Sequence, residues 1–370
     1  MKRLEVKLHD KRMDAIEEIN MICAENCENI CFILGGGIYG KVIAQYLKDN
    51  GLKPSVQYVI DDEYITDENV AAGMISFSAF LKEYALSVPL IFGFYNYEII
   101  QKKRAQYKDV VKYMYDFHIT VVNDIRVGWN SDYVKEHYNE FNTTFEMFIE
   151  EKSRYTMQCY IDAATVGDFE RLFLECHEEI PYFNDVLKNV KINKLFDCGA
   201  FDGDSIHDFI GAFDSYKEIY AIEPDKNNVD KIKQRVEREN IVGLNIIEKG
   251  VFSQTTTLHF LSEGKSSSHI SENGDVSIDV IKLDDLYDII TSDSLIKMDI
   301  EGSELEALKG AQKVIRDKSP VLAICVYHKR EDLITIPQFI DSIVNPGTYR
   351  YYLRFQGLDL AELVFFAVPK

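Results

Sequence analysis

Two acidic residues and a histidine lie at the ends of apolar stretches that are expected to be neighbouring strands. Asp299 and Glu301 end the expected strand Leu295–Ile300, and His328 follows the expected strand Val321–Tyr327. Because a histidine titrates near physiological pH, His328 is the first candidate for a base that takes a proton from a hydroxyl. Asp299 or Glu301 would orient that base, bind hydroxyls of an acceptor or hold part of a cofactor. A buried histidine with satisfied hydrogen bonds is the structural alternative.

The same three side chains could instead hold a divalent metal ion. Carboxylate oxygens and an imidazole nitrogen are compatible with magnesium or manganese, and such an ion would lower the pKa of an acceptor hydroxyl. We assign no residue to a metal from the sequence, and the ion stays an alternative to catalysis by His328. The polar residues that follow Glu301 also have a local structural explanation, because Ser303 and Glu306 have the spacing of a helix capping box.

A glycine-containing loop follows another expected strand, Leu195–Cys198. Glycines leave room where a backbone passes close to a ligand, and the helix that follows offers free amide groups. In a doubly wound sheet, ligands bind at the carboxyl ends of the strands, beside the topological switch point. We therefore expect a cofactor to contact this loop and the helix start, through Asp197, Gly199, Phe201, Asp202, Gly203 and Ser205.

The acidic residues of this loop indicate which cofactor binds there. Asp197, Asp202 and Asp204 would be a poor cradle for a pyrophosphate, but they suit a ligand with an ammonium and a sulfonium group. S-adenosylmethionine carries both groups, so it is expected in preference to NAD. Glu223 lies roughly 20 positions after the glycine loop, where an acid accepts hydrogen bonds from ribose hydroxyls. The remaining expected cofactor contacts are Pro224, next to Glu223, and Gly250 and Val251, which are expected to lie over the adenine.

These blocks together resemble the FkbM-type methyltransferases. The resemblance covers about residues 191–370 and is carried by Asp197–Asp204, Ile222–Asp225 and, above all, Lys297–Leu305 followed by Leu308–Ala311. It implies transfer of a methyl group from S-adenosylmethionine to oxygen, often to a hydroxyl of a sugar or natural product. One departure is Leu353-Arg354-Phe355, where related sequences tend to carry a histidine after the arginine. If that histidine acts in the relatives, its task falls to His328 here or is absent.

A second glycine loop lies near the N-terminus. Gly35, Gly37 and Gly40 follow the expected strand Cys31–Leu34 and open a helix, and Asp61 closes the next expected strand. This is the context of a dinucleotide-binding fingerprint. The segment is nevertheless expected to hold only about three or four strands, as in the small Rossmann-like modules attached to sugar-modifying enzymes. We expect it to bind a nucleotide or nucleotide-sugar, with tight backbone packing as the alternative.

The alternation of strand-like and helix-like stretches predicts an α/β protein. Residues 1–122 are predicted to form a small Rossmann-like domain, 123–190 a helical connector or cap, and 191–370 the methyltransferase domain. That last domain is expected to be a seven-stranded Rossmann-like sheet that ends in an antiparallel hairpin. Its expected strands and helices also include Ile219–Ile222, Leu244–Glu248, Ile278–Lys282, Arg350–Phe355, Leu363–Val368, Lys226–Glu239 and Ser303–Arg316.

The composition excludes several classes of partner. The 370 residues carry a net charge of −20, whereas a protein that grips nucleic-acid phosphates needs a basic face. No apolar run approaches the ~20 residues that span a bilayer. The seven cysteines are scattered and do not suggest a secreted disulfide framework. We expect a cytoplasmic protein whose acceptor is a small molecule or carbohydrate, either free or linked to a nucleotide or a carrier.

Two other functions remain open at this point. An NAD-dependent oxidoreductase would use the N-terminal fingerprint and bind its substrate with the C-terminal domain. The acids around Gly199 and the long match over Lys297–Ala311 argue against it. A non-catalytic module would bind the cofactor only for stability, and formation of S-adenosylhomocysteine with an acceptor would separate it from an enzyme.

Overall fold

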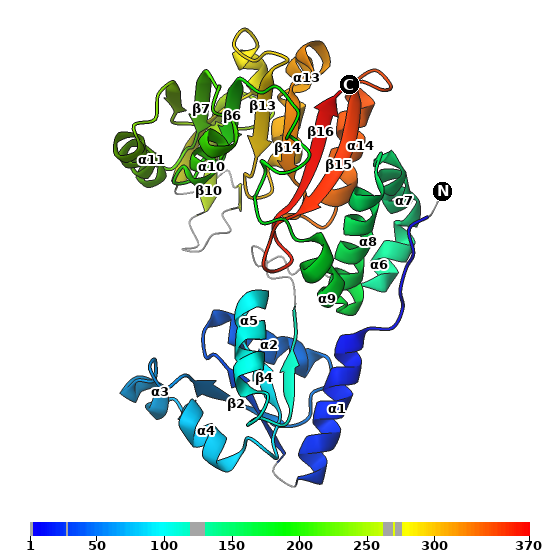
Figure 1. Ribbon diagram of the computed structural model, residues 1–370, viewed down its shortest axis with the longest axis vertical. Coiled ribbons are helices and arrows are strands. Elements are labelled where there is room, and N and C mark those ends of the chain that lie inside the picture. Colours follow the sequence, from blue (N-terminus) through cyan, green and yellow to red (C-terminus); the bar gives the residue numbers. More distant parts are fainter. Residues whose placement is uncertain (1–2, 27–28, 119–129, 262–268, 271–275) are drawn as a thin grey trace.

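The computed structural model is built on two separate α/β sheets joined by a group of helices (Figure 1). In the view of Figure 1 the N-terminal sheet lies below, the larger C-terminal sheet above, and helices α6–α9 beside the C-terminal sheet. This arrangement is the α/β class with a smaller N-terminal sheet that the sequence predicts. The structure describes residues 3–26, 29–118, 130–261, 269–270 and 276–370.

The N-terminal unit is a parallel sheet with the strand order β3-β2-β1-β4-β5. The described residues therefore form five strands here, more than the three or four expected. The two that the sequence pattern missed, β3 and β5, are only two and three residues long and too short for a periodic signal. The elements are α1 Lys11–Glu25, β1 Ile30–Leu34, α2 Ile38–Asp49, β2 Ser55–Ile60, α3 Asp67–Ala71, β3 Ile75–Ser76, α4 Phe77–Glu83, β4 Leu90–Phe92, α5 Tyr97–Tyr107 and β5 Met114–Asp116.

A group of helices follows: α6 Ser131–Glu136, α7 Tyr138–Met147, α8 Glu151–Val166, α9 Phe169–Arg171 and the π-helical turn η1 Leu172–Cys176. Gly167 has φ +71° and ends α8. Helix α8 is buried along most of its length, packs against β15, and shares one continuous hydrophobic core with the C-terminal sheet. The boundary predicted near residue 190 is not a boundary of that core, and the domain limits stay a prediction.

The C-terminal sheet of the described chain has seven strands in the order β15-β16-β14-β13-β6-β7-β8. All neighbouring pairs are parallel except those of β16, which runs antiparallel to both β14 and β15. This confirms the predicted seven-stranded Rossmann-like sheet with a terminal antiparallel hairpin. The strands are β6 Lys194–Cys198, β7 Glu218–Ile222, β8 Leu244–Ile247, β13 Ser294–Met298, β14 Val321–Cys325, β15 Tyr349–Phe355 and β16 Leu363–Pro369.

A small second sheet carries the strand that was expected at Ile278–Lys282. Its strands have the order β11-β10-β12-β9, so this segment, as β12, does not join the large sheet. The elements are β9 Gly250–Val251, β10 Thr256–Leu261, β11 His269–Ile270 and β12 Val276–Ile281. Strand β9 pairs in parallel with β12, so Gly250 and Val251 belong to this small sheet.

The helix expected at Ser303–Arg316 is interrupted. Gly310 separates its two halves, because a Cβ there would lie 2.2 Å from the carbonyl oxygen of Phe252. The predicted capping box is also wrong: the Ser303 side chain makes no cap hydrogen bond, and Glu306 accepts one from Ser253 instead. The helical elements of this part are α10 Asp204–Ala212, α11 Lys226–Glu239, η2 Leu283–Leu286, α12 Glu304–Lys309, α13 Gln312–Lys318 and α14 Asp332–Ile343. No helix in the described part of the chain is long and apolar enough to cross a membrane.

The carboxyl ends of the parallel strands in the two sheets point toward one another. The turn between β15 and β16 lies at the carboxyl end of β14 and reaches the start of α5 in the N-terminal unit (Figure 1). The backbone amide of Tyr97 in α5 donates a hydrogen bond to the carbonyl of Leu358 in that turn, at 2.9 Å. The two edges where ligands bind in such sheets are therefore linked by one turn.

Candidate active site

The loops after β6 and β13 meet at the switch point of the C-terminal sheet. Strands β6 and β13 are neighbours, while the chain continues from β6 to β7 on the other side. The amide of Asp299 donates to the carbonyl of Cys198 at 3.1 Å, which ties the two loops together. Gly199 has φ +78°, and a Cβ there would lie 1.9 Å from the carbonyl oxygen of Asp299. Only glycine therefore permits this contact.

Asp197 and Lys297 face each other across β6 and β13 and form a buried ion pair. The Asp197 Oδ1 lies 3.0 Å from Lys297 Nζ, and its Oδ2 accepts a hydrogen bond of 2.5 Å from the Ser205 hydroxyl. Lys297 also donates to the carbonyl of Gly199 at 3.0 Å. Asp197 and Ser205, both predicted cofactor contacts, are thus turned toward each other and toward Lys297. They hold the shape of the glycine loop from inside.

Glu223 ends β7 and supports the same loop from the other side. Its Oε2 accepts from the amide of Phe201, and its Oε1 from the amide of Asp225, each at 2.9 Å. Oε1 also accepts from the side-chain amide of Asn228 at 3.4 Å. A carboxylate has about four lone-pair positions, so Oε2 can accept a further hydrogen bond. Burial raises the pKa of Glu223. Pro224 follows it and lies beside Gly250, whose Cβ would be 3.9 Å from the proline Cγ.

The charge of the glycine loop differs from what its sequence suggests. Asp197 is neutralised by Lys297, and Asp202 pairs with Arg235 of α11 at 3.2 Å. Phe201 is exposed, with φ +45°, and the Lys231 ammonium lies 5.1 Å from its ring centroid. The negative charge that would face a cationic ligand therefore lies farther along the edge, after β13 and β14.

Asp225 caps α11. Its side chain accepts hydrogen bonds from the amides of Asn227 and Asn228. The cap does not compete with Glu223, since each residue uses its own carboxylate. Gly203 precedes α10 with φ +84°, and a Cβ there would lie 3.3 Å from the Arg235 side chain.

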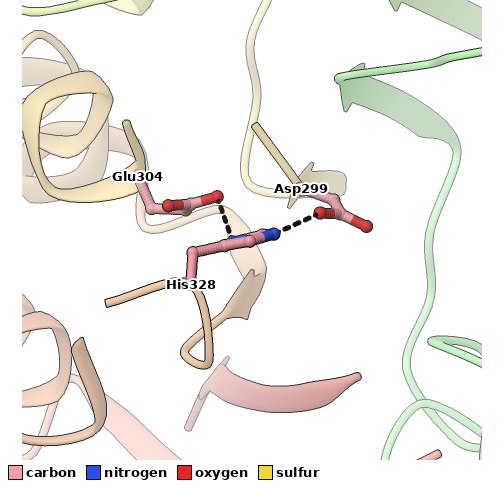
Figure 2. A group of neighbouring side chains, drawn as sticks. All are labelled: Asp299, Glu304 and His328. Carbon is pink, nitrogen blue, oxygen red and sulfur yellow. Dashed lines mark ion pairs between the residues drawn. The ribbon is translucent and has the colours of Figure 1, made fainter. Parts of the chain in front are cut away.

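His328 follows β14 and lies between two carboxylates (Figure 2). Its Nδ1 is 3.0 Å from Glu304 Oε1, and its Nε2 is 3.3 Å from Asp299 Oδ1. Glu304 is fully buried and also accepts the amide hydrogen of Ile300, at 2.8 Å. Glu301 approaches the same Nε2 at 3.7 Å from an exposed position. The structure therefore brings the three predicted catalytic residues together and adds Glu304 behind the imidazole.

The carboxylates decide the protonation state of His328. Burial lowers the pKa of the imidazole, but the Glu304 carboxylate, followed by Asp299 and Glu301, outweighs burial and raises the pKa to about 9. At neutral pH both ring nitrogens therefore carry protons. His328 must lose one of them before it can act as a base.

Residues 197–351 match the family model of the methyltransferase FkbM domain. This part of the chain is therefore similar to the methyltransferase FkbM domain. The fold of the chain is also found in the crystal structure of methyltransferase FkbM from Methylobacillus flagellatus KT, with 21% identity, 96% of each chain covered and a TM-score of 0.70. An rRNA methylase from Streptococcus thermophilus covers 50% of this chain and 92% of its own, with 12% identity and a TM-score of 0.32. No curated protein matches the chain.

Two tyrosines and a glutamate that the sequence did not indicate join this methyltransferase site. Tyr182, from the segment before the FkbM domain, donates its hydroxyl to Asp299 Oδ2 at 2.9 Å. Tyr327 donates to Glu362 Oε1 at 3.2 Å and lies 3.5 Å from Asp299 Oδ1. Tyr182 and Glu362 lie outside the matched range, so no motif of that domain could have indicated them.

The carboxylate oxygens of Asp299 and Glu304 and an imidazole nitrogen of His328 are donor types that suit a divalent ion. These atoms lie within 4.8 Å of one another. Metal bonds of about 2.0–2.2 Å require ligand atoms closer than about 4.4 Å. In the structure, Glu304 meets one ring nitrogen and Asp299 the other (Figure 2), so a single ion would have to displace at least one of these pairs. The arrangement fits a charge-compensated imidazolium better than a metal site.

The N-terminal glycine loop lies in the other sheet. Gly35 has φ +110°, and a Cβ on Gly40 would lie 2.0 Å from the carbonyl oxygen of Gly35. Gly37 precedes α2, and no side chain caps that helix. Asp61, expected to meet a ribose, forms an ion pair of 2.7 Å with Lys103 of α5. Backbone packing thus explains Gly40, while the role of the loop in binding stays a prediction.

Proposed function

We propose that this methyltransferase uses S-adenosylmethionine and transfers the methyl group to a hydroxyl of a sugar, glycan or related metabolite. The observation that carries the proposal is His328, backed by the buried Glu304 and facing Asp299 at the edge of the sheet where ligands bind. A histidine oriented by a carboxylate on its far nitrogen is the usual arrangement of a general base.

The residues around the switch point fit the cofactor. S-adenosylmethionine would supply an electrophilic methyl group on a sulfonium. Glu223 would accept hydrogen bonds from the ribose hydroxyls, and the exposed Phe201 and the pair Gly250 and Val251 would line the adenosine portion. The carboxylates near His328 would favour its cationic end.

The methyl acceptor needs a group that removes its proton. A hydroxyl placed within hydrogen-bond reach of His328 Nε2 would transfer its proton there once the imidazole is neutral. Glu304, whose Oε1 lies 3.0 Å from Nδ1, would then stabilise the imidazolium that forms. Holding the hydroxyl in line with the methyl group contributes the rest, and such positioning supplies up to about 7–11 kcal/mol in well-oriented systems.

Two alternatives are weaker on physical grounds. For an oxidoreductase, Asp61 would have to leave Lys103 to bind a ribose. A module that binds its cofactor only for stability would not need the buried pair of Glu304 and His328, since burying charged groups is costly. For the N-terminal unit we retain a nucleotide or nucleotide-sugar as its ligand, because its glycine loop lies at the carboxyl edge of a parallel sheet.

The proposal is tested by incubating the full chain with S-adenosylmethionine and a panel of glycosides, nucleotide-sugars and other hydroxyl compounds. The measurement is the formation of S-adenosylhomocysteine, with the methylated position identified by mass spectrometry and NMR. We expect an O-methylated product that depends on the acceptor. Methylation of nitrogen or carbon only would contradict the assignment to oxygen.

A further inference from the structure

We infer that Tyr182 and Glu362 are positioning residues on the side of the site where the methyl acceptor binds. We further infer that the acceptor carries no negative charge near the hydroxyl that is methylated. Both residues come from segments outside the matched FkbM domain. The inference rests on the proposed function, because it assumes that an acceptor binds next to Asp299 and His328. It adds which residues orient that acceptor and which charge it can carry.

Tyr182 is held in one position by four contacts. Its hydroxyl donates to Asp299 Oδ2 at 2.9 Å and lies 3.4 Å from the Cys325 sulfur. Its backbone amide donates to Gln356 Oε1 at 2.7 Å, in the turn after β15. Its ring lies 5.2 Å from the Lys297 ammonium. Tyr182 thus connects the segment before the domain to the carboxylate that faces His328.

Glu362 reaches the same carboxylate through Tyr327. The phenol of Tyr327 lies 3.2 Å from Glu362 Oε1 and 3.5 Å from Asp299 Oδ1. The carbonyl of Glu362 accepts from the amide of Gln356 at 3.0 Å, which closes the turn between β15 and β16. Asp299 is therefore approached by two phenols, one on each of its oxygens. This fixes the orientation of its carboxylate.

The backbone is strained at both positions. Tyr182 has φ +55° and Glu362 has φ +60°, a region that side chains other than glycine rarely adopt. Among the described residues, seven non-glycine residues have positive φ. Four of them, Tyr182, Phe201, Glu301 and Glu362, lie in the loops of this site. Such strain persists where the surrounding structure requires a residue at that place, and it concentrates at functional sites.

The charges of these residues set the acceptor class. His328 faces three carboxylates at once, those of Asp299, Glu301 and Glu304. Lys297 is already paired with Asp197. A carboxylate or phosphate on the acceptor would meet a like charge at Asp299, which costs free energy in a partly buried site. It would meet a second one at Glu362 when that group is ionised, since burial and Asp299 raise the pKa of Glu362 to about 7. Neutral hydroxyls and ammonium groups instead find carboxylates and phenols as partners.

The test uses the full chain, the variants Tyr182→Phe and Glu362→Gln, and Tyr155→Phe as a matched control. Tyr155 lies in α8 before the same segment, and its hydroxyl donates to Glu175 at 2.6 Å, away from the site. Acceptors are offered in matched sets: neutral glycosides, the corresponding uronates and the corresponding amino sugars. The measurements are kcat and KM for each acceptor and the Kd of S-adenosylhomocysteine by calorimetry.

We expect wild-type kcat/KM to be at least tenfold higher for neutral or amino glycosides than for uronates. Tyr182→Phe should lower kcat at least tenfold while the Kd of S-adenosylhomocysteine changes less than twofold, and Tyr155→Phe should change neither. Glu362→Gln should lower the ratio of kcat/KM for neutral glycosides to kcat/KM for uronates at least threefold. In an enzyme that binds S-adenosylhomocysteine, the inference is overturned if uronates are used equally well, if Tyr182→Phe behaves as the control does, or if no neutral or amino glycoside is methylated. Absence of S-adenosylhomocysteine binding would instead contradict the proposed function itself.

Discussion

Glu304 lies 3.0 Å from Nδ1 of His328, on the side of the imidazole away from Asp299 (Figure 2). The glutamate is fully buried, and its Oε1 also accepts the amide hydrogen of Ile300, so it is fixed in the turn after β13. From the sequence, Asp299 or Glu301 were expected to orient the histidine. In the structure Glu304 lies behind the ring and Asp299 in front of it, on the side of the proposed acceptor.

Removal of the imidazole of His328 or of the carboxylate of Glu304 should lower the rate of methyl transfer. General-base catalysis contributes about 10²–10⁴-fold, so we expect His328→Ala to reduce kcat by roughly 100-fold or more. Glu304→Gln keeps an oxygen for the amide of Ile300 and should reduce kcat by about tenfold. The exposed His207, which pairs with Glu239, provides the control variant His207→Ala. Unchanged turnover in His328→Ala would exclude it as the base.

The pH profile should follow the titration of His328. Glu304, Asp299 and Glu301 outweigh burial and raise the pKa of the imidazole to about 9, and only the neutral form accepts a proton. We therefore expect kcat/KM to rise tenfold per pH unit from pH 6 and to level off near pH 9. In Glu304→Gln the carboxylate that raises the pKa is gone, so the plateau should begin at lower pH. A wild-type profile that is flat between pH 6 and 9 would contradict this.

Asp332 should make folding less favourable as pH rises. Burial, together with the nearby Glu304, raises the pKa of Asp332 from its ordinary 3.8 to about 7. The folded protein then binds one more proton than the unfolded chain between about pH 4 and 7. Stability from this group is present below pH 4 and is lost as pH rises through 7.

The variant Asp332→Asn keeps an oxygen for the amide of Lys329, which donates to Asp332 at 2.7 Å. It should therefore be more stable than wild type at pH 8, by roughly 1–3 kcal/mol, and show a weaker loss of stability between pH 4 and 7. Urea unfolding at several pH values measures both effects. A variant that is less stable at pH 8, with unchanged pH dependence, would show that folding does not raise the pKa of Asp332.

Chelation distinguishes a base from a metal-assisted reaction. Both ring nitrogens of His328 face carboxylates, so we expect exhaustive treatment with EDTA to leave kcat within about twofold. Added magnesium or manganese should not raise it. Loss of activity that is restored by one of these ions would instead establish the metal alternative, with Asp299 as a candidate ligand.

The sequence predicted the fold well where patterns are long. Helix α11 has the predicted limits, Lys226–Glu239, because it is amphipathic and begins at the cap Asp225. The short strands β3 and β5 of the N-terminal sheet were missed. The break of a predicted helix at Gly310 depends on the carbonyl of Phe252, more than fifty positions away. Contacts of that kind have no local signal.

The candidate site was predicted only in part, because several of its contacts also depend on tertiary structure. Strand ends placed Asp299 and His328 at one edge, since parallel neighbours share that edge. The neutralisation of Asp197 by Lys297 depends on the register between β6 and β13, which composition does not reveal. Glu304 looked like an ordinary acid in the first turn of a helix. Tyr182 and Glu362 come from irregular segments whose course depends on tertiary contacts.

Calorimetric titration of the full chain with S-adenosylhomocysteine tests the central claim most directly. We predict one binding site per chain, no heat with NADH at the same concentrations, and at least tenfold weaker binding by Glu223→Ala, which removes the carboxylate expected to meet the ribose. The variant Glu218→Ala, at the start of the same strand and paired with Lys194, should bind as wild type does. Saturable binding of NADH without binding of S-adenosylhomocysteine would contradict the account.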